Sequence, residues 1–293
     1  MAVDVAWSEP LFYARLPHPW LEWVFSVPGN CFGPPIWQVL GPLWIFVWFQ
    51  YGQGDHGNTN TTSTILLFLA ATSCTMGLLV VPWMYFLRGH VWIIPKILYS
   101  HASFALSPLV GTLLCFALDK YIHSNNSNNS SSEAAASLGY HLIVLYNVSC
   151  TVVLLLKHNV LRKRPCATSV YYKTCIPRKH YPIIPKVLAK GAPDMSFPSG
   201  DVMAATCLAT IVWHLQYTHT AMAIVLVAAL GRMYFLAHHA LDTVVGMMVA
   251  LLVQGFSAGG ILLPRMGTAQ WYHPLLALGG LTVASKFRKG DQK

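Results

Sequence analysis

Three polar patterns in the chain decide its fold, and they read KHNVLRKRP at residues 157–165, FPSGD at residues 197–201 and RMYFLAHHALD at residues 232–242. Their charges stand out because the surrounding sequence is apolar. Between Lys190 and Arg265 the only Lys or Arg is Arg232, which lies in the apolar run 221–237. Ionisable groups at or near membrane depth are costly to bury and usually mark function. The three patterns are therefore the candidates for a functional site.

The composition is that of an integral membrane protein. The chain has 293 residues, of which 55% are hydrophobic and only 10% charged, whereas a soluble domain carries about 25% charged residues. The net charge of +9 is a local property, because nine of the nineteen Lys and Arg lie between Lys157 and Lys190. The chain shows no soluble basic domain, so we expect the bilayer and not nucleic acid as its partner.

Apolar runs predict an all-α, polytopic membrane bundle with six core transmembrane helices. A crossing takes about 20 mostly apolar residues. The six predicted spans cover residues 36–51, 64–87, 138–156, 198–217, 221–237 and 241–263. A seventh span would cover 101–118, a run that contains one His, several Ser and Pro108.

The chain divides into three predicted regions. Residues 1–35, rich in Pro and Trp, predict an irregular or short amphipathic segment at the membrane surface. Residues 36–263 predict a single transmembrane domain. Residues 264–293 predict a basic tail with a short apolar patch. The Asn- and Ser-rich run 124–132 predicts a solvated loop.

The segment that joins the first two patterns is long and basic. We predict that seven of its cations follow the positive-inside bias or contact lipid head groups: Arg162, Lys163, Lys173, Arg178, Lys179, Lys186 and Lys190. Cys166 and Cys175 share this segment and could form a disulfide in an oxidising compartment. No Cys or His spacing is typical of a metal site, so we expect neither a metal nor a cofactor.

The three patterns predict an anion site at one membrane face. Lys157 follows one predicted span directly, Ser199 and Gly200 begin another, and the third pattern joins the last two spans. Lys157, Arg164 and Arg232 supply cations that suit phosphate oxygens. A helix that starts at Ser199 and Gly200 offers unpaired backbone N–H groups, a hydroxyl and the positive end of its dipole. Together these groups predict a cradle for a tetrahedral oxyanion.

His238 and Asp242 lie four residues apart, so the two side chains can touch on one helical face. An Asp that bonds one imidazole nitrogen fixes the tautomer and leaves the other nitrogen free to attack. This spacing predicts a nucleophile with a supporting carboxylate.

Together these residues resemble the type-2 phosphatidic acid phosphatase superfamily, which includes lipid phosphate phosphatases, glucose-6-phosphatase-like enzymes and vanadium haloperoxidases. The family pattern is Lys-x6-Arg-Pro, then Pro-Ser-Gly-His, then Ser-Arg-x5-His-x3-Asp. The first motif is complete here, and the third is complete except that Gly231 replaces its Ser. In the second motif Asp201 stands where the family has His. The resemblance covers roughly residues 138–263, and it implies that they are the catalytic half of the predicted transmembrane domain.

By that resemblance, His238 would attack phosphorus and form a phosphohistidine, oriented by Asp242 and without a metal. The phosphoryl oxygens would be held by Lys157, Arg164, Ser199, Gly200 and Arg232. The second-motif His of the family protonates the leaving group.

Asp201 leaves several interpretations open. An Asp among cations should stay ionised and be a poor proton donor near pH 7, unless burial keeps it protonated and able to act as the acid. His239 could donate the proton instead. The leaving group could also need no proton, as when a lipid diphosphate such as an isoprenoid diphosphate releases inorganic phosphate. Finally, Asp201 could mark a catalytically weakened member.

The sequence thus predicts a membrane phosphatase that acts on a lipid phosphate or diphosphate, such as phosphatidate, a sphingoid-base phosphate or a prenyl diphosphate. The alternatives are a silent phospholipid-binding protein, a phosphoryl or headgroup transferase, and a sugar-phosphate phosphatase. We expect it in the endoplasmic reticulum or another endomembrane, with six spans and a lumenal site; seven spans would put the motifs on the N-terminal side. Four sequons predict a glycoprotein: Asn60, Asn125, Asn128 and Asn129. The sequence leaves the oligomeric state open.

Overall fold

A computed structural model describes residues 2–22, 41–46, 101–125, 129–191, 194–260 and 263–287. Across these residues the chain is helical, and its one β-type pairing is an isolated bridge between Arg162 and Met195. The predicted all-α class is confirmed for this part of the chain. The predicted span 64–87 lies outside the described residues, as does most of the span 36–51.

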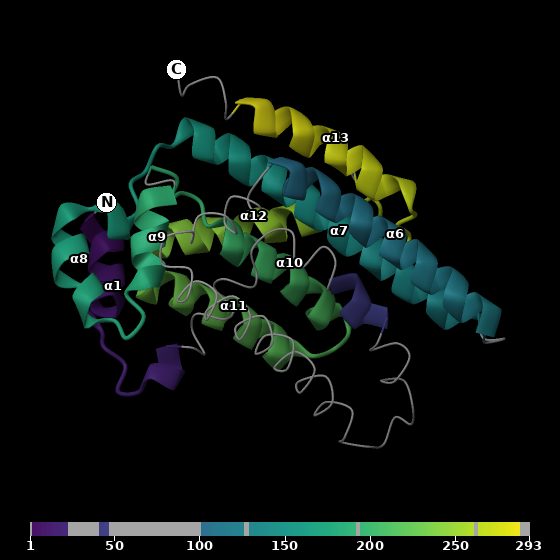
Figure 1. The fold of residues 1–293 in the computed structure, drawn as a ribbon. Coiled ribbons are helices and arrows are strands. Elements are labelled where there is room, and N and C mark those ends of the chain that lie inside the picture. The colour runs from purple at the N-terminus through teal and green to yellow at the C-terminus, as the bar shows by residue number, and fades with distance from the viewer. Residues whose placement is uncertain are drawn as a thin grey trace.

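Long helices form the body of the protein. They are α6 (His101–Asn125), α7 (Asn129–Asn159), α10 (Gly200–His214), α11 (Thr218–Tyr234), α12 (Ala240–Ala258) and α13 (Tyr272–Phe287). Helix α10 is in contact with α7, α11 and α12, and α7 also packs along α6 and α13. Figure 1 shows α6, α7 and α13 running side by side along one flank of the bundle.

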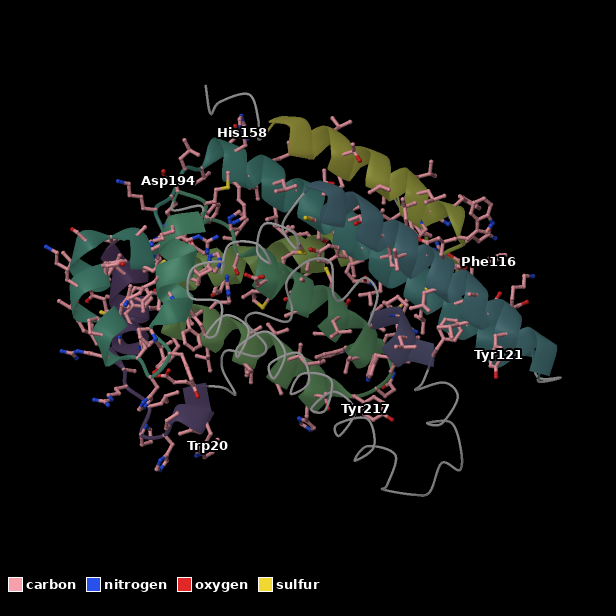
Figure 2. All side chains as sticks on the ribbon, in the orientation of Figure 1. Trp20, Phe116, Tyr121, His158, Asp194 and Tyr217 are labelled. Atoms are coloured by element: carbon pink, nitrogen blue, oxygen red, sulfur yellow. The ribbon has the colours of Figure 1, made fainter. Side chains whose placement is uncertain are left out.

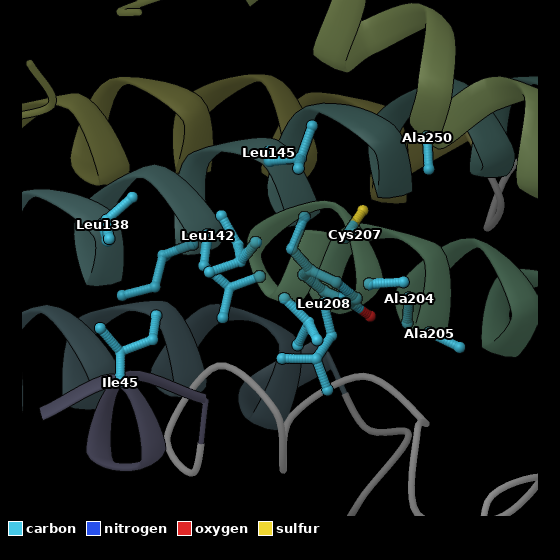
Figure 3. Packing of buried hydrophobic residues seen from close by; sticks show 14 of the residues in the cluster. Ile45, Leu138, Leu142, Leu145, Ala204, Ala205, Cys207, Leu208 and Ala250 are labelled. Carbon is cyan, nitrogen blue, oxygen red and sulfur yellow. The ribbon is translucent and has the colours of Figure 1, made fainter. Parts of the chain in front are cut away.

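The core lies where α7 meets α10 and α12. Leu138, Leu142 and Leu145 form one buried stripe on α7, because their spacing of four and three residues returns to the same helical face. Figure 3 shows this stripe beside α10, whose facing side chains include the small residues Ala204 and Cys207. Small side chains let neighbouring helices approach closely, which favours packing where lipid gives little hydrophobic drive.

Two helices of the described part are long and apolar enough to cross a membrane, 133–159 and 240–258. At 1.5 Å per residue they are roughly 40 and 28 Å long, against a hydrocarbon thickness of about 30 Å. Helix α11 is also apolar but has 17 residues, and α10 has 15. The six predicted crossings are therefore not confirmed. The exposed faces carry apolar side chains, such as Phe116 of α6 (Figure 2) and Leu252 of α12, as lipid-facing surfaces do.

Short elements gather at one end of the bundle. They are α1 (Ala2–Tyr13), η1 (Pro165–Ala167), α8 (Ser169–Thr174), η2 (Ile176–Arg178) and α9 (Ile183–Gly191). Helix α1 packs against α11 and α12, and α9 packs against η1 (Figure 1). In Figure 2, His158 and Asp194 lie toward this end, whereas Tyr217, between α10 and α11, lies away from it. This is the end at which α7 and α11 finish and α10 and α12 begin.

Two segments differ from the sequence expectation. The predicted tail contains α13, which buries Leu281 and Ala284 within the bundle. Its apolar patch is too short to cross a membrane, but length does not prevent a helix from packing on a neighbour. The predicted loop 124–132 is shorter than expected, because α7 already begins at Asn129. The three-region division of the chain stays a prediction.

Candidate active site

Backbone hydrogen bonds join the three sequence patterns. The Ser199 N–H donates to the backbone oxygen of Asp242 at 2.8 Å, which ties the second pattern to the third. The Cys166 N–H, directly after the first pattern, donates to the backbone oxygen of Leu236 at 2.9 Å. The ends of α7 and α11 therefore meet the starts of α10 and α12 in one place, as the sequence predicted.

Ser199 is the N-cap of α10, so its side chain is held by the helix that it begins. The fully buried Ser199 hydroxyl accepts from the N–H of Val202 at 3.4 Å. Because a hydroxyl has one proton besides its lone pairs, Ser199 retains a donor for an anion. Gly200 is the first helical residue, at the positive end of the dipole. The structure thus places the start of α10, with the hydroxyl of Ser199, at this end of the bundle.

Gly246 allows α12 to pass close to this helix start. A Cβ atom added at Gly246 would lie 2.4 Å from the backbone oxygen of Ser199, nearer than Cβ contacts occur in proteins. Gly255 lies on the same helix, and nothing is within 4 Å of a Cβ added there. The position of the Ser199 turn therefore depends on residue 246 being a glycine, which has no side chain.

We expect Gly246→Ala to lower the midpoint of thermal unfolding of the purified protein in detergent. Forcing an extra carbon into a packed contact costs about 1–3 kcal/mol. Gly255→Ala is the matched control, and it should raise the midpoint slightly, since Ala is favoured over Gly inside a helix by about 0.5–1 kcal/mol. Equal midpoints for the two variants would contradict the close approach at Gly246.

The geometry around His238 fixes which ring nitrogen carries its proton. Nδ1 lies 2.6 Å from the backbone oxygen of Ser196 and 3.8 Å from Oδ2 of Asp242. A carbonyl oxygen only accepts, so Nδ1 is the donor and Nε2 keeps its lone pair. His238 therefore has the tautomer that was expected from the sequence. The group nearest to its Nδ1 atom, however, is the backbone oxygen of Ser196 and not the carboxylate of Asp242.

Asp242 is farther from His238 than the spacing suggested because the two residues do not share a helical face. His238 lies in the turn before α12, whereas Asp242 is the third residue of that helix and turns back to accept from the N–H of His239 at 2.8 Å. Its Oδ2 atom also accepts from the hydroxyl of Ser196. Asp242 therefore orients His238 partly through Ser196.

Arg162 contacts the other oxygen of this carboxylate. Its Nη1 atom donates to Oδ1 of Asp242 at 2.8 Å, and its Nη2 atom donates to Asp4. The prediction that Arg162 contacts lipid head groups is thus wrong, and its alternative, the positive-inside bias, stays a prediction. The prediction of lipid head-group contact is also wrong for Lys179, which is buried, donates to the Ala14 oxygen at 2.6 Å and lies 3.6 Å from the ring centre of Tyr234.

Burial lowers the pKa of His238 to about 3. The charges of Arg164, Arg232 and Lys157 act in the same direction, and the nearby carboxylate of Asp242 opposes them. His238 is therefore neutral at pH 7, the form in which Nε2 has a lone pair to donate.

The cations of the first pattern are held by backbone oxygens of the other segments. Lys157 Nζ donates to the oxygen of Met195 at 2.8 Å, and Arg164 Nη1 donates to the oxygen of Ala237 at 3.3 Å. Met195 precedes the second pattern and Ala237 directly precedes His238. Both cations are thus fixed next to the imidazole whose pKa they lower.

Asp201 lies between the third cation and the imidazole. Its Oδ2 atom is 2.7 Å from Arg232 Nη2 and 4.0 Å from His238 Nε2. Both Asp201 and Arg232 are buried. The carboxylate therefore engages the guanidinium that the sequence assigned to a phosphoryl group, beside the nitrogen assigned as nucleophile.

His239 is oriented differently from His238. It is the N-cap of α12, and its ring packs edge-on against Phe12 of α1 with ring centres 5.7 Å apart. Phe12 belongs to a buried cluster with Cys166 and Cys175, both of which are free thiols.

All eight predicted site residues lie at this end of the bundle: Lys157, Arg164, Ser199, Gly200, Asp201, Arg232, His238 and Asp242. Their chemical roles stay predictions. Sequence reasoning missed Ser196, Arg162 and Asp4. In the described part of the chain no three His, Cys, Asp or Glu side chains are grouped as metal ligands would be.

Comparison with known families gives one match. The model described as the PAP2 superfamily matches residues 135–259, which include Lys157 and Asp242 and nearly coincide with the predicted catalytic half. Curated proteins and solved structures give no match.

Proposed function

Residues 135–259 belong to the PAP2 superfamily, and from this membership we propose that the protein is a membrane phosphatase of lipid phosphates or lipid diphosphates. The superfamily consists mainly of phosphatases, which supports hydrolysis of a phosphoric ester. One observation carries the proposal. His238 is neutral, with Nδ1 bonded to Ser196 and Nε2 free, among the charges of three cations.

In the proposed reaction, Nε2 of His238 attacks phosphorus and the bond from phosphorus to the leaving oxygen breaks. Water then attacks the phosphohistidine, releases inorganic phosphate and restores the imidazole. The imidazole becomes positive when it bonds phosphorus, and the carboxylate of Asp242 stabilises that charge. No protein group other than His238 bonds covalently to the substrate.

The cations and the helix start would bind the phosphoryl oxygens. Lys157, Arg164 and Arg232 neutralise charge that builds up on the equatorial oxygens, and they are in place before the reaction. The hydroxyl of Ser199 and the N–H of Gly200 add directed donors. Metal independence is part of this proposal, because these groups can supply the positive charge.

The lipid substrate is supported by where the site lies. Lys157 is near the end of α7 and Asp242 near the start of α12, and among the described residues these are the two helices long and apolar enough to cross a membrane. A phosphate head group could therefore meet the cations while its acyl or prenyl chain stays in the bilayer. A soluble sugar phosphate would not need this placement.

The position of Asp201 supports a diphosphate as the preferred substrate. An Asp that accepts a charge-assisted hydrogen bond from Arg232 at 2.7 Å acts as a carboxylate, which cannot give a proton to a leaving alkoxide. A monophosphate leaving from a diphosphate needs no such proton. His239 is a poor substitute as the donor, because its ring packs against Phe12.

Phosphate release by the purified protein in detergent tests the proposal, with phosphatidate, a sphingoid-base phosphate, a prenyl diphosphate and glucose 6-phosphate as substrates. We expect release from the lipids, fastest from the diphosphate. Release from glucose 6-phosphate alone would favour the sugar-phosphate alternative. Transfer to an added alcohol would favour a transferase. No release from a folded protein would favour a silent lipid-binding protein, an alternative supported by the engagement of Arg232 by Asp201.

The membrane side of the site depends on the number of crossings. Helix α1 packs against α11 and α12 beside the motifs, so in our proposal the N-terminal segment and the motifs lie on the same membrane face. This favours seven spans, with 101–118 as the added one, over the six-span, lumenal arrangement that the sequence favoured. The basic segment 157–190 then faces the cytosol under the positive-inside bias. The four sequons fall on the lumenal side, which supports a glycoprotein of the endoplasmic reticulum or another endomembrane.

We expect Lys173→Cys, at an exposed position of α8, to react with a membrane-impermeant maleimide in sealed microsomes whose cytosolic face is outside. The wild-type protein under the same conditions gives the background from native cysteines. Reaction only after detergent opens the vesicles would restore the lumenal orientation.

A further inference from the structure

Arg162 is shared between two carboxylates from distant parts of the chain. Nη1 bonds Oδ1 of Asp242 at 2.8 Å, and Nη2 bonds Oδ2 of Asp4, which lies on α1. The Arg162 side chain is 14% exposed and that of Asp4 is 10% exposed, so the pair is largely removed from water. The planar fork of Arg suits two carboxylates at once, whereas a Lys presents a single point charge.

Helix α1, which carries Asp4, also caps the start of α12. The first N–H groups of a helix have no partner within it. Here the N–H of Ala240 donates to the hydroxyl of Ser8 at 2.8 Å, and the N–H of Leu241 donates to Oδ1 of Asp4 at 2.7 Å. The hydroxyl of the buried Ser8 in turn donates to the backbone oxygen of Asp4 at 2.8 Å. Asp4 therefore contacts both Arg162 and the first turn of the helix that carries Asp242.

Contacts elsewhere hold this N-terminal segment in place. Phe12 is buried in a cluster with Leu236, which directly precedes the His238 turn. The buried carboxylate of Glu22 accepts from the N–H groups of His180 and Tyr181, both at 2.9 Å. Residues 2–22 are thus bound to the basic segment and to the third motif independently of Asp4.

Sharing the guanidinium affects the charge that Asp242 offers to His238. With Asp4 present, the positive charge of Arg162 is divided between two carboxylates. Without it, the whole charge falls on Asp242, which then supports a positive imidazole less well. The guanidinium also loses one of the two anchors that fix its plane.

We propose that α1 is part of the active site, and that Asp4 is a positioning residue that acts on Asp242 through Arg162. The inference rests on the proposed function, because the reaction gives the charge on Asp242 its importance. Asp4 is distinct from the binding groups, and removing its charge should lower kcat and leave KM unchanged.

A double-mutant cycle in the full-length protein tests this with Asp4→Asn, Arg162→Lys and their combination. We expect Asp4→Asn to lower kcat at least about tenfold at constant KM, and Asp4→Glu to restore most of it. In the Arg162→Lys background, Asp4→Asn should have almost no further effect, because linked groups are not additive. Glu9→Gln is the matched control on α1, since Glu9 only accepts from the hydroxyl of Tyr171 and Gln retains an acceptor.

The results separate a positioning role from one in docking α1 alone. Ser8→Ala removes a cap on α12 without touching Arg162, so a docking role predicts equal losses for Ser8→Ala and Asp4→Asn. Equal losses, or additive effects of Asp4→Asn and Arg162→Lys on kcat, would overturn the inference. If the wild type releases phosphate but Asp4→Asn has the wild-type kcat, the inference fails and the proposed function stands.

If the wild type releases no phosphate, the proposed function fails, and thermal unfolding midpoints of the same four proteins decide about Asp4. If the changes in midpoint caused by Asp4→Asn and Arg162→Lys are not additive, the link between Asp4 and Arg162 is supported. If the two changes are additive, the link is overturned.

Discussion

His238→Ala is expected to abolish phosphate release, with a loss of at least about 1,000-fold in kcat, because the proposed covalent route has no other nucleophile. The binding groups stay in place in this variant, so the substrate should still bind. Release is measured as inorganic phosphate from a prenyl diphosphate and from phosphatidate. To detect the phosphohistidine, the reaction with labelled substrate is stopped rapidly without acid. Labelled protein should be found for the wild type and not for the variant.

His219→Ala is the control for this experiment. His219 is exposed and lies in the first turn of α11, whereas Arg232 of the site lies in the last turn. This variant should release phosphate at the wild-type rate. Because burial lowers the pKa of His238 to about 3, protonation of His238 does not explain any loss of wild-type activity between pH 7 and 5. Full activity of His238→Ala would exclude the phosphohistidine route.

Asp201→His is expected to change which substrates are used. The imidazole restores a group that can protonate a leaving alkoxide, and general acids contribute about 100- to 10,000-fold to such steps. The ratio of kcat/KM for phosphatidate over the prenyl diphosphate should therefore rise at least about tenfold. The diphosphate rate itself should change much less, since its leaving group needs no proton.

Asp201→Asn separates the two effects of the substitution. Like His, Asn removes the negative charge that engages Arg232 at 2.7 Å, but it supplies no acid. Asp201→Asn could raise the ratio of kcat/KM for phosphatidate over the prenyl diphosphate as much as Asp201→His does. In that case the gain comes from freeing Arg232 and not from proton donation. If the wild type already prefers phosphatidate to the diphosphate at neutral pH, the proposed role of Asp201 is wrong.

The three motifs could be predicted from the sequence because each is a local signal. Charges are rare in this chain, and a span boundary beside each motif indicated that they meet at one face. The sequence predicted a helix start at Ser199 and Gly200, and in the structure Ser199 is the N-cap of α10 and Gly200 its first residue. Most residues of the candidate site could thus be predicted from helix ends and from the spacing of charges.

The remaining groups depend on contacts between distant residues. Arg162 lies 80 residues from Asp242 and 158 from Asp4 in the sequence. The basic segment that contains Arg162 therefore indicated only a charged surface. Ser196 was missed because a backbone oxygen, its main contact with His238, leaves no trace in composition. A weak signal existed for Asp4: the chain has only ten acids, and an acid in a membrane protein usually has a cationic partner.

The bond between the side chain of Asp4 and the N–H of Leu241 joins residues that are 237 positions apart. During synthesis at about 5–20 residues per second, Asp4 leaves the ribosome roughly 10–50 s before Leu241 does. Until then Asp4 and Ser8 have no partner on α12, and a nascent chain cannot complete the site. Completion of the candidate site is therefore a late event in biogenesis, reached only after the last motif has been inserted.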